Sequence, residues 1–209
     1  PVLCSFNQFT KLDPYIWQTW MNIMRRIPAS KLWMLEFDGD PVNNLVDEAN
    51  RQGVEKERII VTPLLSKSLE FLSKGLCDLY LDTPRFNAHT TAKDALWSGV
   101  PIVTLPGIGM ASRVAAALVL LQDPSGKTVA RNLGDYEEIA VRILSSTKRT
   151  LRLKEEVRKS RLSSTLFDTV GWMPRWERQV KNAFDMTAAG YFPPAHFHLV
   201  GDSWRHPKN

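Results

Sequence analysis

The sequence predicts an α/β fold in which a Rossmann-like parallel sheet carries helices on both faces. Short apolar runs alternate along the chain with stretches whose apolar residues recur at helical spacing. Several of these runs, such as IVTL at 102–105, are nearly continuous, which is typical of parallel strands buried on both faces. Strands separated by helices form βαβ units, and right-handed crossovers then build a doubly wound sheet.

Five apolar runs are expected to supply the strands of this sheet. They are 2–6, 31–37, 58–63, 77–83 and 100–106.

Helices are expected between the strands, and their ends carry recognisable signals. Asp13 is an N-cap followed by Pro14 at the first helical position, and Pro28 ends that helix. Gly53 and Gly99 close two of the later helices. The expected helices cover 14–27, 42–53, 66–74, 90–98, 111–121 with Ser112 as N-cap, 135–146 and 147–161.

Composition restricts the class of protein. The 209 residues are 44% hydrophobic and 23% charged, which is ordinary for a globular protein, and no run is long enough to cross a bilayer. The net charge of +5 comes from basic residues that are spread out, and in 147–161 they alternate with glutamates as on a solvated helix face. We therefore expect neither nucleic acid nor a membrane as partner, and an anionic small molecule suits this charge equally well.

The cysteines indicate the redox compartment of the protein, and the first residues indicate whether the chain is a fragment. Cys4 and Cys77 lie in apolar runs and are interpreted as buried residues of a reducing compartment. Metal-ligand spacing is absent, and no signal peptide is visible at the start. Because the chain does not begin with Met, we expect a fragment or a trimmed chain.

Polar residues gather where the predicted strands end. Parallel α/β sheets bind ligands at the carboxyl ends of their strands, here at 6–11, 62–67, 82–94 and 104–112. These positions hold Asn7, Gln8 and Lys11 after the first strand, Lys67 after the third, and Thr90, Thr91 and Asp94 after the fourth.

This arrangement favours a nucleotide-diphosphate site. A helix that starts at Thr90 offers free N–H groups and the positive end of its dipole to a phosphate, and threonine hydroxyls add donors. Lys11 is placed to neutralise a pyrophosphate, and Asp94 to accept hydrogen bonds from a ribose. The run 107–112 lacks the third glycine of a dinucleotide fingerprint and is interpreted as a loop.

Longer motifs add a family resemblance. FNQFTKLDP, RIIVTP, LDTPRFNAHTTAKDALWSGVPIVTLPG and ASRVAA resemble the C-terminal catalytic lobe of the O-GlcNAc transferase family in order and spacing. Spindly-type O-fucosyltransferases resemble the chain less, since they typically have a threonine run at His89 and Asn at Gln8. The resemblance implies the C-terminal half of a two-lobed GT-B glycosyltransferase. Such an enzyme is inverting, needs no metal or cofactor, and transfers N-acetylglucosamine from UDP-GlcNAc to Ser or Thr of cytoplasmic and nuclear proteins.

The resemblance also implies a role for each matching residue. Lys11 is the catalytic residue, because it stabilises the departing UDP. The other matching residues bind donor: Gln8, Lys11, His89, Thr90 and Thr91 at the diphosphate, Lys67 and Asp94 at the ribose, and the backbone of Leu65 at the uracil.

Three positions depart from the family pattern. Glu70 and Ser73 stand where a histidine that stacks on uracil and an arginine near the base are usual, so an altered base pocket is expected. Phe86 stands where a small cysteine beside the N-acetyl group is frequent, and its bulk is expected to narrow the sugar pocket.

The chain is expected to have two parts. Residues 1–165 form the nucleotide-sugar-binding lobe, and 166–209 form a C-terminal helix and tail that packs toward an N-terminal lobe missing here. Tetratricopeptide repeats that select acceptor proteins are also missing, so the fragment alone is expected to be inactive. Two alternatives stay open: a non-catalytic nucleotide-sugar-binding or scaffold domain, and an O-fucosyltransferase that uses GDP-fucose.

Overall fold

A computed structural model describes residues 1–37, 41–64 and 66–190, with the backbone alone for Lys67, Ser68 and Glu70. Its centre is a parallel sheet of five strands in the order β3-β2-β1-β4-β5. The strands are β1 (Val2–Ser5), β2 (Lys31–Glu36), β3 (Ile59–Pro63), β4 (Leu79–Leu81) and β5 (Ile102–Val103). Cys4 lies in register with Trp33 on one side and Tyr80 on the other, so β1 is central. The predicted α/β class is confirmed.

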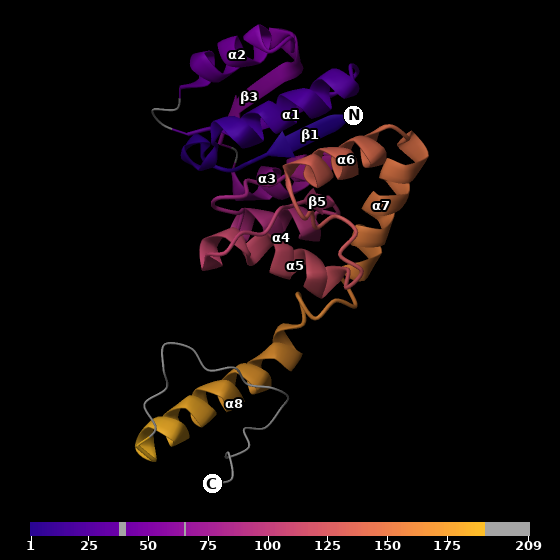
Figure 1. Ribbon diagram of the computed structural model, residues 1–209. Helices are drawn as coiled ribbons and strands as arrows, with labels where there is room; N and C mark the ends of the chain where they lie inside the picture. The colour runs from indigo at the N-terminus through magenta and orange to yellow at the C-terminus, as the bar shows by residue number, and fades with distance from the viewer. Residues whose placement is uncertain (38–40, 65, 191–209) are drawn as a thin grey trace. The chain divides into compact units, whose positions relative to one another are not determined.

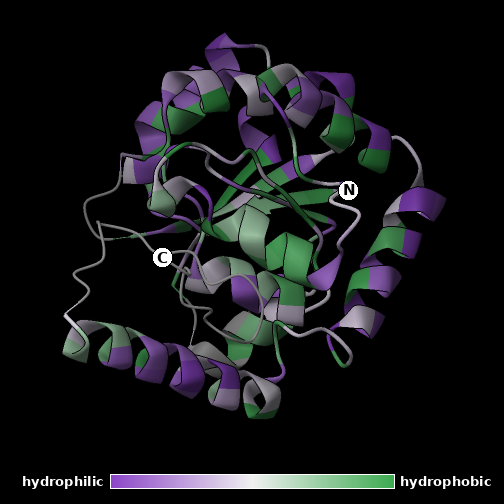
Figure 2. Cartoon of the chain, turned by 60° about the horizontal axis from the view of Figure 1, so that its bottom comes forward, coloured by the Kyte–Doolittle hydropathy of each residue, from purple (hydrophilic) through white to green (hydrophobic). Residues whose placement is uncertain are grey.

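Helices connect the strands and cover the sheet. They are α1 (Pro14–Arg26), α2 (Val42–Arg51), α3 (Lys67–Lys74), α4 (Thr90–Trp97), α5 (Val114–Gln122), α6 (Leu133–Leu144) and α7 (Thr147–Ser160). Three short 3-10 helices are η1 (Phe9–Lys11), η2 (Lys56–Arg58) and η3 (Met110–Ser112). Helix α1 packs on α6, and α4 contacts α3, α5 and α7 (Figure 1). In Figure 2 the hydrophobic strands lie at the centre, and the helices around them turn hydrophilic residues outward.

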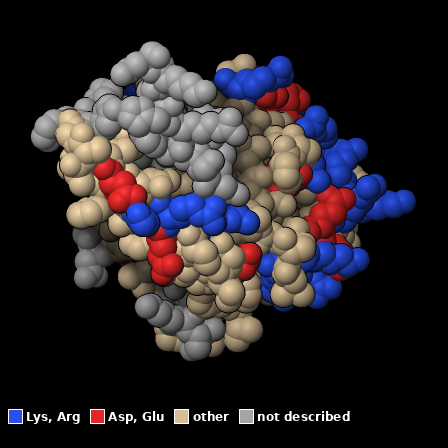
Figure 3. Space-filling view, turned by 90° about the horizontal axis from the view of Figure 1, so that it is seen from below, with Lys and Arg blue, Asp and Glu red and all other residues tan. Residues whose placement is uncertain are grey.

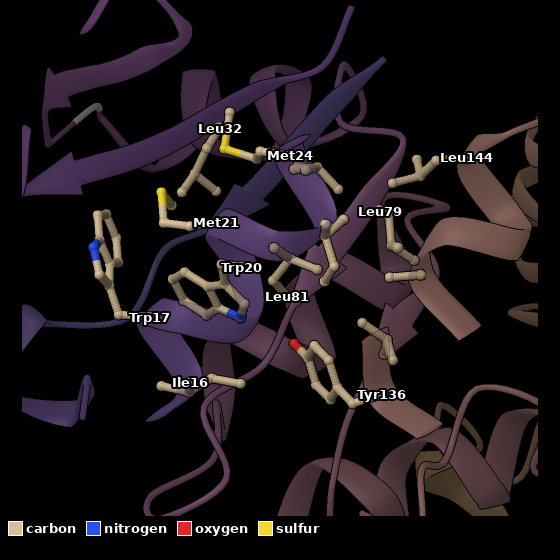
Figure 4. Close-up of a cluster of buried hydrophobic side chains, with 14 of the residues drawn as sticks. Ile16, Trp17, Trp20, Met21, Met24, Leu32, Leu79, Leu81, Tyr136 and Leu144 are labelled. Atoms are coloured by element: carbon tan, nitrogen blue, oxygen red, sulfur yellow. The ribbon is translucent and has the colours of Figure 1, made fainter. Parts of the chain in front are cut away.

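The hydrophobic core fills the space between the sheet and helices α1 and α6. Trp20 on α1 and Tyr136 on α6 are fully buried there and face one another (Figure 4). The Tyr136 hydroxyl donates to the backbone oxygen of Asp82, 2.9 Å away, directly after β4. The core therefore fixes the carboxyl end of β4, which belongs to the edge of the sheet where the sequence predicts a ligand site.

Two predicted elements are wrong in detail. Helix α5 starts at Val114 with Arg113 as its N-cap, not Ser112. Ser112 instead ends η3, and its hydroxyl donates to the Gly109 oxygen at 2.8 Å. The run 100–106 forms only the short strand β5, because Thr104 leaves the ladder for a single bridge to Val129.

Charges and cysteines follow the sequence pattern. On α7, Arg152 pairs with Glu156, and Arg158 pairs with Glu155. Figure 3 shows acidic groups beside the basic ones on the face it presents. Cys4 and Cys77 are buried and free. No helix in the described ranges is long and apolar enough to cross a membrane.

The chain divides into two compact units, Pro1–Ser164 and Thr165–Asn209. The first contains the sheet with α1 to α7. In the second, α8 (Thr169–Ala188) buries none of its side chains, and Trp172 and Trp176 stack at a centroid distance of 5.9 Å. The packing of 166–209 on another lobe stays a prediction.

Candidate donor-binding site

Strands β1 and β4 are neighbours, so the polar residues that follow them meet at one edge. The buried Asn7 donates from Nδ2 to the Thr83 hydroxyl at 2.8 Å. That hydroxyl donates in turn to the Phe86 oxygen at 2.6 Å. Two segments 76 residues apart are thereby joined directly beneath the candidate site.

The loop between β4 and α4 is held by the buried Asn87. Its Nδ2 donates to the Thr83 oxygen at 2.9 Å, and its Oδ1 accepts from the Ala115 N–H at 3.3 Å. Its backbone N–H donates to the Ala111 oxygen at 2.9 Å. The loop is therefore fixed to the end of β4, to η3 and to the first turn of α5.

Asp82 lies under this loop and is fully buried. Its Oδ1 accepts from the Ala88 N–H at 2.6 Å, and its Oδ2 accepts from the Thr104 hydroxyl at 2.7 Å. Burial raises its pKa to about 7, although these donors and the charge of Lys11 oppose the rise. Sequence reasoning placed Asp82 at the ligand edge but gave it no role. A carboxylate that ends a buried strand was the available signal.

Lys11 is brought to the same edge by η1. Its Nζ donates to the Asn87 oxygen at 3.1 Å and lies 4.1 Å from the centroid of the Phe86 ring. Partial burial lowers its pKa, and the charge of Asp82 acts in the opposite direction. Lys11 is thus a partly desolvated cation beside the start of α4.

Helix α4 starts at Thr90, with His89 as its N-cap residue. The His89 side chain does not cap the helix, and its Nε2 lies 3.1 Å from the Ala111 oxygen. Thr90 is exposed and Thr91 half-buried, and within the described part of the chain neither hydroxyl forms a hydrogen bond. Free N–H groups and free hydroxyls therefore coincide at this helix start.

Asp94, in the same helix, is held by two lysines. Its Oδ2 lies 3.5 Å from Nζ of the fully buried Lys74, and its Oδ1 lies 3.5 Å from Nζ of the exposed Lys93. Sequence reasoning missed Lys74, because nothing local distinguishes it from a solvated lysine at a helix end.

The structure describes some of the remaining expected residues in full and others in part or not at all. Gln8 is exposed at the N-cap position of η1. Lys67 is the first residue of α3, which follows β3 at the same edge, but its side chain and that of Glu70 are not described. Leu65 lies outside the described residues. The Phe86 ring is 44% exposed, and its centroid lies 5.0 Å from that of His89.

The site therefore combines the partly buried Lys11 ammonium, a helix start with free donors, and the Asp94 carboxylate one turn along, which two further lysines hold. The first two suit a diphosphate, and the carboxylate suits a pair of hydroxyl groups. No group of three or more His, Cys, Asp or Glu that could hold a metal ion occurs among the residues the structure describes.

Solved structures of glycosyltransferases share this fold. An O-GlcNAc transferase of Thermobaculum terrenum, solved as a mutant, superposes with a TM-score of 0.74 at 27% identity, over 81% of this chain and 32% of that one. The C-terminal domain of a group 1 glycosyltransferase from Francisella tularensis has a TM-score of 0.59 at 13% identity, over 78% of this chain and 84% of that one. The fold is that of the C-terminal half of a GT-B glycosyltransferase.

Residues 1–174 match glycosyl transferase family 41, and the chain belongs to this family. It is 37% identical over 206 residues to a probable UDP-N-acetylglucosamine–peptide N-acetylglucosaminyltransferase, SEC, of Arabidopsis thaliana. It is 36% identical over 168 residues to the Caenorhabditis elegans enzyme of that name, and 30% identical over 168 residues to the SPINDLY protein of Petunia hybrida. The matches cover 99%, 80% and 78% of this chain but only 21%, 14% and 18% of those relatives.

Proposed function

We propose that the chain is the donor-binding lobe of an inverting, metal-independent glycosyltransferase that uses UDP-GlcNAc and needs no cofactor. The observation that carries the proposal is the meeting of Lys11 with the start of α4 at the carboxyl ends of β1 and β4. The family membership and the names of its relatives support the choice of donor.

In this proposal the residues divide the work. Lys11 stabilises negative charge on the departing UDP, as preorganised cations do where charge develops. Gln8, His89, Thr90 and Thr91 contact the diphosphate, and Lys67, Asp94 and the backbone of Leu65 contact the nucleoside. The sugar goes to Ser or Thr hydroxyls of cytoplasmic and nuclear proteins.

Catalysis is proposed to need more than this chain. The chain spans about a fifth or less of the curated relatives it matches. The acceptor contacts and the group that accepts the acceptor's proton are assigned to a second lobe, which α8 helps to join. The 209 residues alone are expected to bind nucleotide weakly and to transfer no sugar.

Titration calorimetry with UDP, GDP, UDP-GlcNAc and GDP-fucose tests the proposal. We expect uridine nucleotides to bind and Lys11→Ala to weaken that binding at least about tenfold, because a charge-assisted contact to phosphate contributes about 1.5–3 kcal/mol. Lys31→Ala is the matched control, because Lys31 is exposed at the opposite edge of the sheet and its loss should leave affinity unchanged.

One observation favours a second candidate function, that of a non-catalytic scaffold. The Phe86 ring lies against the Lys11 ammonium, in the place where a donor's phosphate would approach. A chain that binds none of the four ligands would instead be a non-catalytic scaffold, and a preference for GDP-fucose would indicate an O-fucosyltransferase.

A further inference from the structure

Asp82 joins the loop in front of α4 to the end of β5. One carboxylate oxygen accepts from the Ala88 N–H and the other from the Thr104 hydroxyl. The side chain is fully buried, and no lysine or arginine in the described ranges forms an ion pair with it. Asp82 is thus a buried carboxyl group held by neutral donors, and one of these donors, the Ala88 N–H, belongs to the residue before His89.

The groups that face Asp82 come from several elements. Tyr80 on β4 and Tyr136 on α6 both have pKa values raised by burial and by the charge of Asp82, so both stay neutral. Lys11 on η1 supplies the opposing positive charge. Within the described part of the chain, Lys11 is the cation among the largest influences on the pKa of Asp82.

A diphosphate at the start of α4 changes that balance. It brings new negative charge close to a carboxylate already out of water, and it competes with Asp82 for the field of Lys11. Like charges in a shared, poorly solvated site favour protonation of one of them. Burial has already raised the pKa of Asp82 to about 7, so a further rise crosses physiological pH.

We propose that Asp82 is a positioning residue that takes up a proton when a diphosphate binds at the start of α4. The inference rests on the proposed donor-binding function. The proton comes from solvent and sits on Oδ2, which then donates to the Thr104 hydroxyl oxygen. The hydroxyl hydrogen of Thr104 turns away from Asp82, and Oδ1 still accepts from the Ala88 N–H. The loop therefore stays tied to the sheet while the local negative charge is removed.

The first measurement is the affinity for UDP-GlcNAc between pH 6 and pH 8. Both phosphates of this ligand are esterified, so it lacks the terminal phosphate group that titrates near pH 6. Because the complex holds more protons than the free chain, binding should weaken as the pH rises. An upward shift of one unit in the pKa of Asp82 gives about a fivefold loss over this range. At pH 7.5, binding heats in buffers of different ionisation enthalpy should also reveal proton uptake.

Three variants identify the side chain that takes up the proton. Asp82→Asn keeps an oxygen for Ala88 and offers an N–H to Thr104, so it should bind at every pH as the wild-type chain does at pH 6. Asp78→Asn makes the same change at the other end of β4, where Asp78 accepts from the Val2 N–H, and should keep the wild-type slope. His89→Gln replaces the imidazole next to the start of α4 with an uncharged amide, and should bind more weakly with the same slope.

The outcomes separate the two proposals. A wild-type affinity that is flat in pH, or a slope that persists in Asp82→Asn, overturns this inference alone. Absence of UDP-GlcNAc binding at every pH overturns the proposed function and this inference with it. If circular dichroism shows that Asp82→Asn does not fold, proton uptake by the wild-type chain and by His89→Gln decides: its presence in both supports the inference, and its absence from either refutes it.

Discussion

The ammonium group of Lys11 has two neighbours that already satisfy part of its needs. It donates to the Asn87 oxygen, and the Phe86 ring covers it at 4.1 Å. A cation over an aromatic face is stabilised by about 0.5–1 kcal/mol at an exposed site. A phosphate that binds Lys11 must therefore compete with a ring that is itself 44% exposed.

Removal of that ring should strengthen binding. We expect Phe86→Ala to raise the affinity for UDP about threefold, which corresponds to roughly 0.7 kcal/mol, and to raise that for UDP-GlcNAc further because space opens beside the sugar. Phe86→Leu keeps most of the bulk without the aromatic face. It should therefore show the increased affinity for UDP but not the additional increase for UDP-GlcNAc. Calorimetry on the three chains measures this, and weaker binding of both ligands to Phe86→Ala would show that the ring contributes to the donor site.

Asp82 should also control how stability depends on pH. Its folded pKa of about 7 lies above the unfolded value, so folding is favoured most at low pH, where the group is protonated in both states. The contribution of Asp82 to the free energy of unfolding is on the order of 4 kcal/mol, because its two pKa values differ by about three pH units. It is lost as the pH rises from about 4 to 7. Urea unfolding across this range should show a smaller decline for Asp82→Asn than for the wild-type chain, and parallel curves would contradict the pKa.

Among the elements, several helices begin at a side chain that accepts from the first turn. Asp13 accepts from the N–H groups of Tyr15 and Ile16 at 2.9 and 3.1 Å, and it starts α1, which is buried against the sheet. Asp168 accepts from the Gly171 N–H and starts α8, which buries no side chain. The same residue type thus caps one helix of the core and one helix outside it.

The two caps should differ in their effect on global stability. We expect Asp13→Ala to lower the free energy of unfolding of the first unit by about 1–2 kcal/mol, since it removes two capping bonds. The exposed Arg85 partner of Asp13 adds little to this. Asp168→Ala should leave the main urea transition in place. Equal shifts in the two variants would mean that α8 unfolds together with the sheet.

At the scale of the whole chain, the sheet and its helices hold all the core that the structure describes. The hydrophobic core draws on all five strands and on α1, α2, α6 and α7, all within Pro1–Ser164. Helix α8 instead exposes apolar side chains: Val170, Trp172, Met173, Trp176, Val180 and Phe184. Such a surface favours association in an isolated chain.

A chain shortened to residues 1–164 should therefore fold by itself. We expect its thermal midpoint to lie within about 3 °C of that of the full chain, because a loss below about 1 kcal/mol shifts a domain of this size by only a few degrees. It should also self-associate less in sedimentation. A large drop in the midpoint would show that α8 stabilises the sheet.

Much of the fold was predictable because its signals are local. Apolar runs, the cap Asp13 with Pro14, and the closing glycines specify elements through neighbouring residues alone. The strand-end rule then selected Lys11, Thr90, Thr91 and Asp94, which the structure places at the same edge of the sheet. The short β5 was not predictable, since the partners of Thr104, Asp82 and Val129, lie far away in the sequence. The start of α5 was misplaced because Ser112, a typical N-cap residue, instead ends the short helix η3 and donates to the Gly109 oxygen.

The sequence by itself determined the α/β class, the order of the elements and which strand ends carry polar groups. Only the tertiary structure decided how those groups are engaged: Phe86 on Lys11, Lys74 on Asp94, and Asp82 under the loop. The reason is physical. Local conformation follows from neighbours along the chain, whereas burial and charge depend on residues brought together from far apart, such as Lys11 and Asn87 at a separation of 76.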